Sequence, residues 1–187
     1  STGTIMATLA VGDSPTDVAF SVDGLFAYVA NQFSDTVSVI DVTINAVVAS
    51  VPIAGRPVSI AMTEDGASMY VLGNSSLTIS KVRLDILTIE ETINFTDVNP
   101  AAIAIHGDCL YRTQQFGGAD PGAIDVISIG PGCISMGSAV GSYPTSIAFI
   151  DAPPVPVNDD CADAIAVAVG SHSGTVSYAT NDGLSSC

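Results

Sequence analysis

The chain has 187 residues, 48% of them hydrophobic, so it is long enough to bury a substantial core. Its 4 Lys and Arg residues are outnumbered by 19 Asp and Glu residues, which gives a formal net charge of −15. This negative field repels phosphate groups and disfavours nucleic acid and anionic membrane surfaces as partners. No apolar run approaches the roughly 18 residues of a membrane-spanning helix, so no membrane span is expected.

The N-terminal region is predicted to begin with a strand over residues 4–11, TIMATLAV. No basic segment followed by an apolar one precedes it, as a signal peptide would require. We therefore expect either a mature product whose leader has been removed or a sequence that begins inside a longer protein.

Four proline-containing segments reveal an internal repeat. The segments SPTDVAF, RPVSIAM, NPAAIAI and YPTSIAF share one pattern, and their prolines, Pro15, Pro57, Pro100 and Pro144, lie 42, 43 and 44 residues apart. Periods of this size are typical of proteins built from repeated supersecondary units.

Each unit contains four predicted strands in a fixed order. A short apolar strand follows the proline, and a turn then leads to a second strand that carries a tyrosine. The turns are Asp23-Gly24, Asp65-Gly66 and the reversed Gly107-Asp108, and the second strands read FAYVAN, SMYVLG and CLYRTQ. The third strands read TVSVIDV and LTISKVRL, and the fourth AVVASVPI and IEETINF.

Local chemistry supports these strands. Proline lacks an N–H group and is tolerated where a strand begins, and Asp-Gly accepts the positive φ of a tight hairpin. The strands are rich in Val, Ile and Thr, which suit a pleated sheet. Runs such as AVVASV are apolar at consecutive positions, which predicts cover on both faces of the sheet.

A four-stranded antiparallel sheet that recurs with both faces covered is the blade of a β-propeller. The sequence therefore predicts an all-β propeller fold with three complete blades and pieces of a further, split blade. A parallel β-helix would show a shorter period, and a helical solenoid would show a 3.6-residue periodicity that is absent.

The stretch from Asp23 to Val71 resembles the YVTN family of β-propeller repeats. YVAN at residues 28–31 corresponds to the signature tetrapeptide, TVSVID at 36–41 to the third strand, and AGRPVSIAMTEDG to the crossing between blades. The second unit departs from the signature with YVLG and the third with YRTQ. The resemblance covers about Thr4 to Ile150, within a predicted propeller region of residues 1–150. It implies a ring, which in this family commonly has seven blades.

The strand count leaves the closure of the ring open. Residues 4–11 read as a fourth strand with nothing before it, and residues 145–150 as a first strand with nothing of its type after it. The remaining blades could lie in a longer protein, the tail could supply strands, or another copy could pair at exposed edges and build a polymer.

A proline-rich, acidic linker at residues 151–160 marks the predicted domain boundary. Residues 161–187 then follow a different pattern, and NDDCADAI with GLSSC resembles the opening of disulfide-linked β-sandwich modules of secreted bacterial proteins. A piece this short would need a bridge or a partner to fold.

Four cysteines, an even number, favour an oxidising, extracellular or cell-surface location. Proximity in the sequence favours the disulfides Cys109–Cys133 and Cys161–Cys187, while free buried thiols remain the alternative. The spacings contain no CxxC pair, so zinc is not expected.

No constellation of residues predicts catalysis. The two histidines, His106 and His172, lie far apart in the sequence, and His106 is expected to end a first strand at the Gly107-Asp108 turn. Arg56 and Arg112 are expected to pair with carboxylates, the alternative being an anchor for an acidic ligand. No catalytic, cofactor-binding or metal-binding residue is assigned.

Calcium binding and glycosylation are supported by weaker sequence signals. Residues 157–163 and 180–183 could offer carboxylate oxygens to Ca²⁺, without the loop that would make calcium specific. Asn74 and Asn94 begin glycosylation sequons expected on exposed turns or edges.

The sequence thus favours a non-catalytic extracellular protein with a structural or interaction role, such as a surface-layer, adhesive or filament-forming module that self-associates. The alternative is a fragment of a lactonase-like or quinoprotein-like propeller whose catalytic residues lie outside this chain.

Overall fold

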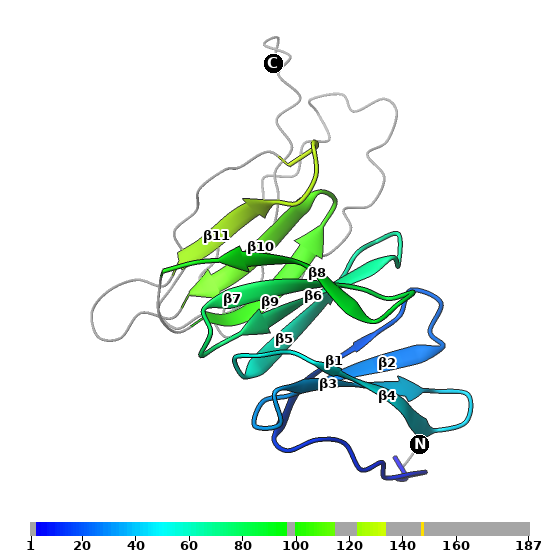
Figure 1. Cartoon of the computed structure of the whole chain (residues 1–187). Helices are drawn as coiled ribbons and strands as arrows, with labels where there is room; N and C mark the ends of the chain where they lie inside the picture. The colour runs from blue at the N-terminus through cyan, green and yellow to red at the C-terminus, as the bar shows by residue number, and fades with distance from the viewer. Residues whose placement is uncertain (1–2, 97–99, 115–122, 134–146, 148–187) are drawn as a thin grey trace, which may run out of the picture.

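The computed structural model describes residues 3–96, 100–114, 123–133 and 147. Within these residues eleven β-strands form three antiparallel sheets. The sheets lie face to face in chain order and spread outward from their first strands (Figure 1). The predicted all-β propeller fold is confirmed, and each sheet is called a blade below.

Strand boundaries follow the predicted order. Blade one contains β1 (Pro15–Phe20), β2 (Phe26–Asn31), β3 (Thr36–Asp41) and β4 (Ala46–Pro52). Blade two contains β5 (Pro57–Met62), β6 (Ser68–Gly73), β7 (Thr78–Arg83) and β8 (Thr88–Asn94). The described part of blade three contains β9 (Pro100–His106), β10 (Cys109–Gln114) and β11 (Ala123–Ser128). The tyrosine-bearing strands match β2, β6 and β10 residue for residue.

Prolines open the innermost strand of each blade, as the repeat predicts. Pro15, Pro57 and Pro100 begin β1, β5 and β9, and the register with the second strand shifts directly beside each of them. The three prolines therefore occupy equivalent positions, each next to a bulge that twists the strand. Pro144 and most of its repeat lie outside the described residues, as do the predicted linker and tail.

The turns after β1 and β5 span five residues each, wider than the tight hairpin predicted. Gly24 and Gly66 adopt φ values of +72° and +67°, which glycine accepts without strain. Asp23 accepts hydrogen bonds from the backbone N–H of Leu25 and the hydroxyl of Ser21, so the carboxylate closes the wider loop. The connection between β9 and β10 is the two-residue Gly107-Asp108 turn.

Burial is greatest in the second strand of each blade and least in the described outermost strands. Every residue of β6 is buried, and all of β2 except its first residue. The outermost strand β4 is mainly exposed, with Val47 at 41% and Val48 at 50% exposure. The prediction that AVVASV is covered on both faces is therefore wrong, because blades diverge outward and outer strands lose their neighbours.

The hydrophobic core lies between the blades. One cluster joins Tyr28, Val37 and Val39 of blade one to Met69 and Val71 of blade two. A second joins blade two to blade three, and a third covers the opposite face of blade one. The core is therefore a row of equivalent interfaces, each formed by adjacent repeats.

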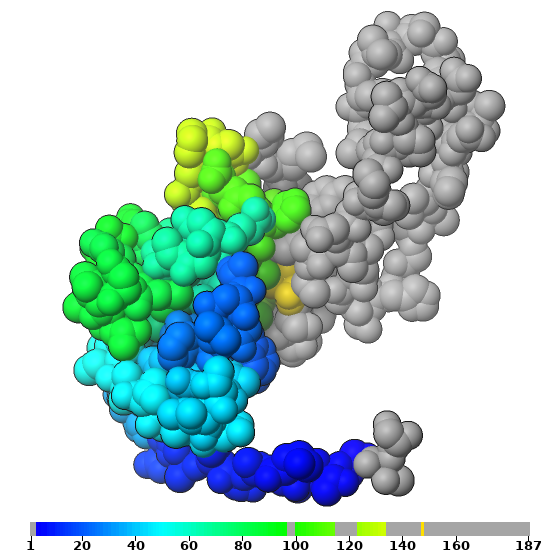
Figure 2. Space-filling model, turned by 90° about the vertical axis from the view of Figure 1, so that its right-hand side faces the viewer, coloured from blue at the N-terminus to red at the C-terminus, as the bar shows by residue number. Residues whose placement is uncertain are grey.

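The N-terminal segment, residues 4–11, forms no strand, although one was predicted there. Leu9 and Val11 nevertheless pack against blade one, on the cluster of Ala27, Val29 and Ile40. In Figure 2 this dark-blue segment runs along the lower side of the molecule, beyond blade one. A strand requires a hydrogen-bonded neighbour, and no described residue supplies one to this segment.

Candidate functional site: the axial cavity

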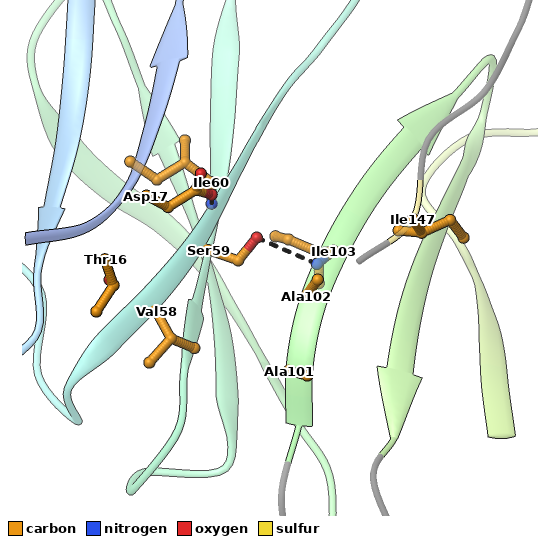
Figure 3. A pocket seen from close by; sticks show the side chains of 9 residues that line it. All are labelled: Thr16, Asp17, Val58, Ser59, Ile60, Ala101, Ala102, Ile103 and Ile147. Atoms are coloured by element: carbon orange, nitrogen blue, oxygen red, sulfur yellow. Dashed lines mark hydrogen bonds between the residues drawn. The ribbon is translucent and has the colours of Figure 1, made fainter. Parts of the chain in front are cut away.

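The innermost strands line a cavity of about 320 Å³ where propellers have their central axis (Figure 3). Strands β1, β5 and β9 contribute most of its wall, and Ile147 of the fourth repeat completes the lining. The lining residues are Thr16, Asp17, Val58, Ser59, Ile60, Ala101, Ala102, Ile103 and Ile147.

Polar side chains in this wall bond one blade to the next. The carboxylate of Asp17 accepts a hydrogen bond of 2.7 Å from the backbone N–H of Ile60. At the equivalent position of blade two, the hydroxyl of Ser59 accepts one of 3.3 Å from Ile103 N–H, drawn as a dashed line in Figure 3. An innermost strand has one edge without a ladder partner, so these side chains satisfy N–H groups that face the neighbouring blade.

These two hydrogen bonds between blades, called the hydrogen-bond relay below, are a feature that sequence reasoning missed. Asp17 and Ser59 both stand two residues after the repeat proline, so a short polar side chain at that position was the available signal. Blade three has Ala102 there, which carries no acceptor, and the N–H of Ala102 itself donates to Thr113. The relay therefore runs from blade one to blade three.

The chemistry that the cavity supports is limited. Asp17 is the one ionisable side chain in the described lining, and both its carboxylate oxygens accept backbone hydrogen bonds, from Val18 and Ile60. A general acid–base pair needs two positioned groups that can exchange protons with a substrate. The described wall therefore offers polar groups that are already engaged within the protein, beside aliphatic side chains.

A second groove, of about 650 Å³, lies between blades one and two on the side of the Asp-Gly turns. Its charges are largely paired, because Lys81 contacts Glu90 at 2.9 Å and Arg83 contacts Asp85 at 2.5 Å. The hydroxyl of Ser21 donates to Asp23 and holds the pKa of that carboxyl below its usual value. These contacts form the turns and the exposed blade surface.

The predicted disulfide between Cys109 and Cys133 is present, with Cα atoms 4.9 Å apart. It ties the start of β10 to the loop that follows β11. Asp108 accepts a hydrogen bond from Gly132 N–H in the same loop, at 2.7 Å. Cys161 and Cys187 lie outside the described residues.

The two arginines singled out from the sequence have different environments. Arg112 is buried, pairs with Asp125 and lies over the ring of Phe95 at 3.8 Å. The predicted ion pair is therefore confirmed for Arg112. Arg56 lies over the ring of Phe33 at 5.6 Å, and no carboxylate among the described residues forms an ion pair with it.

The remaining histidine and glycosylation candidates differ in their exposure to solvent. His106 ends β9 at the Gly107-Asp108 turn, as predicted, and is exposed. Asn74 is half-buried and its side-chain N–H donates to Pro100 C=O, whereas Asn94 is exposed on the outermost strand β8. Only Asn94 therefore has the accessible amide that a glycan needs. His172 and the two segments considered for Ca²⁺ lie outside the described residues.

Within residues 3–96, 100–114, 123–133 and 147, no group of three or more His, Cys, Asp or Glu side chains is arranged to hold a metal ion. The same residues contain no helix of the length and apolarity that crossing a membrane requires.

Comparisons with known proteins show the fold. No family model and no curated protein matches the chain. It is similar to the solved structure of Kuenenia stuttgartiensis hydrazine synthase, with a TM-score of 0.66 and 24% identity over 75% of this chain. It is also similar to the Cps50 (Swd1) β-propeller domain of Myceliophteria thermophila, with a TM-score of 0.56 and 15% identity over 75% of this chain. The chain spans 42% of the length of each of these two structures.

Proposed function

We propose that this chain is a YVTN-type propeller module with a non-catalytic structural or interaction role outside the cytoplasm, where copies associate into larger assemblies. The repeated Pro, Asp-Gly and Tyr positions support the family, because they occupy equivalent places in successive blades. The Cys109–Cys133 disulfide supports an oxidising compartment.

The axial cavity carries this proposal. Propellers that perform chemistry do so with groups that converge on the axis, whereas here the polar groups described at the axis bond neighbouring blades to each other. A wall built in this way contributes to rigidity, since each blade satisfies backbone groups of the next. Rigidity of the blade row is the property that a structural module needs.

Light scattering and electron microscopy of the purified full chain test the role. We expect oligomers or fibres whose mean mass increases with protein concentration. A monodisperse monomer across the accessible concentration range would contradict the structural, self-associating role. The propeller fold would not be affected by that result.

The compartment has a separate test. Peptide mass mapping of native material without reductant should recover the Cys109–Cys133 linked peptide, and reduction should lower the unfolding free energy by about 3 kcal/mol for a closed loop of this size. Recovery of both cysteines as free thiols from native material would contradict an oxidising location.

A second candidate function is a part of a larger catalytic propeller. The observation in its favour is that the chain spans 42% of the hydrazine synthase structure, so further blades could complete a ring. Determination of the intact mass and full sequence of the native polypeptide decides between the two. Additional blades with His and acidic residues at the ends of first strands would favour the enzyme.

A further inference from the structure

The groove between blades one and two contains two carboxylates that are not paired with a cation. Both cationic residues of its lining already form the ion pairs with Glu90 and Asp85 given above. Asp23 and Asp65 also line the groove, and no Lys or Arg among the described residues forms an ion pair with either of them. The groove therefore carries an excess of negative charge, with one unpaired carboxylate from each blade.

Each of these carboxylates uses one oxygen to close the turn of its own blade. Oδ1 of Asp23 accepts hydrogen bonds from a hydroxyl and a backbone N–H of its turn, and Oδ1 of Asp65 accepts the equivalent pair in the next blade. No other residue that the structure describes donates to Oδ2 of either. The hydroxyl hydrogen bonds hold the pKa of both carboxyls below the usual value, so both are charged at neutral pH. The two turns are in contact, because a Cβ atom added at Gly66 would lie 3.4 Å from a methyl carbon of Val22.

The third polar group of the groove is the hydroxyl of Tyr28. This side chain is only 4% exposed and packs in the core between blades one and two. None of the described residues forms a hydrogen bond with the hydroxyl, and the oxygen is not fully enclosed, so it opens into the groove that Tyr28 lines. Burial raises the pKa of Tyr28 and the charge of Asp23 adds to the rise, so that carboxylate acts on the same place. A hydroxyl at this depth without a partner favours a ligand that supplies one.

Apolar side chains complete the lining. Phe26 of β2 and Leu84 after β7 are half-buried, pack against the core cluster and line the groove. A ligand that matches these groups has an aliphatic stem and a cationic head with several N–H donors, as lysine and arginine side chains do. An anionic ligand would meet two charged carboxylates, and the cations of the lining are already engaged.

We propose that the groove between blades one and two binds a lysine or arginine side chain from a basic peptide segment of a partner protein. The cationic head donates to Oδ2 of Asp23 and to the hydroxyl oxygen of Tyr28, with Asp65 supplying the second carboxylate from blade two. The aliphatic stem covers Phe26 and Leu84. The net charge of −15 attracts such a segment from a distance. The proposal rests on the interaction role proposed above and does not depend on self-association.

Fluorescence anisotropy of the full 187-residue chain with labelled peptides tests the site. The probes are peptides of alternating Gly and Arg, of alternating Gly and Lys, and of alternating Gly and Glu. The salt concentration is about 0.15 M, where attraction between exposed charges is screened beyond about 8 Å. We expect saturable binding of at least one basic peptide and none of the acidic peptide. Absence of binding by both basic peptides, or equal binding of the acidic one, would overturn the proposal.

The double variant Asp23→Asn/Asp65→Asn separates the site from the general negative field. Asparagine keeps the acceptor oxygen that closes each turn and replaces Oδ2 by an NH₂ group, so the basic peptide should bind at least about 10-fold more weakly. The matched control is Asp13→Asn/Asp35→Asn, which removes two charges at exposed residues outside the groove, at the opposite end of blade one. The control should weaken binding by less than about 2-fold, since screening limits its reach.

Equal losses for the two double variants would show that net charge alone attracts the peptide, which would overturn the site. Circular dichroism melting checks that both double variants fold. Unfolding of the groove variant would pass the decision to a substitution that changes no charge.

Tyr28→Phe is that substitution. It keeps the ring in the core and removes one hydrogen bond to a charged group, which should weaken binding of the basic peptide by about 10-fold. Tyr70→Phe is the matched control, because Tyr70 is buried in the next blade interface and does not line this groove. Wild-type affinity in Tyr28→Phe, or an equal loss in Tyr70→Phe, would overturn the site.

Free arginine distinguishes a peptide from a small cation. A peptide partner predicts that free arginine displaces the labelled peptide only at concentrations far above the peptide's own Kd. Displacement at similar concentrations would overturn the peptide partner in favour of a small cationic ligand. Failure of the proposal in any of these experiments leaves self-association, which light scattering measures separately, unaffected.

Discussion

Blade one and blade two have the same strand order and the same strand lengths, yet their innermost strands have opposite environments. In β5 four of six residues are buried, and in β1 none is. The sequences PTDVAF and PVSIAM differ little in apolar content, so the difference arises from position in the row of blades. A repeat protein buries its core between units, and the terminal unit keeps one face that only another unit can cover.

The same comparison explains which residues the two blades tolerate. Blade two has Met69, which is completely buried against blade one, where blade one has Ala27 on the face away from blade two. A blade with neighbours on both sides has more space to fill with apolar atoms. The following variants test this difference, in decreasing order of expected effect.

Replacement of Gly55 by Ala should have the largest effect. Gly55 adopts a φ of +94°, and a Cβ atom there would lie 2.0 Å from the hydroxyl oxygen and 2.9 Å from the backbone nitrogen of Ser76. Backbone strain and overpacking together should lower the free energy of unfolding by about 4 kcal/mol, measured by urea denaturation. Gly24→Ala is the control, because Gly24 has a positive φ with no atom within 4 Å of the added carbon. Equal losses for the two variants would show that contact with Ser76 costs nothing.

The pair Ile60→Ala and Val18→Ala directly compares equivalent positions of the innermost strands, Ile60 being buried and Val18 exposed. Ile60→Ala should lower the free energy of unfolding by about 3 kcal/mol, since it leaves a cavity between blades one and two. Val18→Ala should cost less than about 0.5 kcal/mol at protein concentrations where the chain is monomeric. A loss above about 2 kcal/mol for Val18→Ala would mean that a part of the same chain buries β1.

Asp17→Ala tests the hydrogen-bond relay between blades. The N–H of buried Ile60 would lose its acceptor, which should lower the free energy of unfolding by about 2 kcal/mol. Asp17→Ser places the residue of blade two in blade one and should recover most of the loss, because a serine at this position accepts the equivalent bond from Ile103. Failure of serine to recover any stability would indicate that the charge of Asp17, and not its acceptor, matters.

The two core tyrosines predict the smallest effect, which is confined to alkaline pH. Burial raises the pKa of Tyr28 and of Tyr70 above the ordinary value, with Asp23 adding to the rise at Tyr28 and Lys81 opposing it at Tyr70. The folded state therefore holds these protons more tightly, so their contribution is present below about pH 10 and is lost as pH rises through the folded-state pKa. The phenolate absorbance of Tyr28→Phe and Tyr70→Phe identifies each titration, and Lys81→Ala should shift that of Tyr70 upward. Titration of either tyrosine below pH 10 would contradict the assigned burial.

The sequence by itself determined the repeat, the strand order and the class of fold. The equivalence of Pro15, Pro57 and Pro100, the tyrosine-bearing strands and the Cys109–Cys133 pair could all be predicted, because each depends on local geometry or short separation in sequence. An N–H that proline lacks and a φ that glycine accepts constrain the chain wherever it lies in the molecule.

Only the tertiary structure decided which side chains are covered and which join the blades. Apolar patterning could not reveal that AVVASV lies on a mainly exposed outer strand, that residues 4–11 pack on blade one without forming a strand, or that Asp17 bonds Ile60 across an interface. Burial depends on the presence of a neighbouring blade at that distance from the axis, and a ladder depends on a partner strand. Both conditions involve residues about forty positions away, so they follow from how the repeats assemble and not from any one repeat.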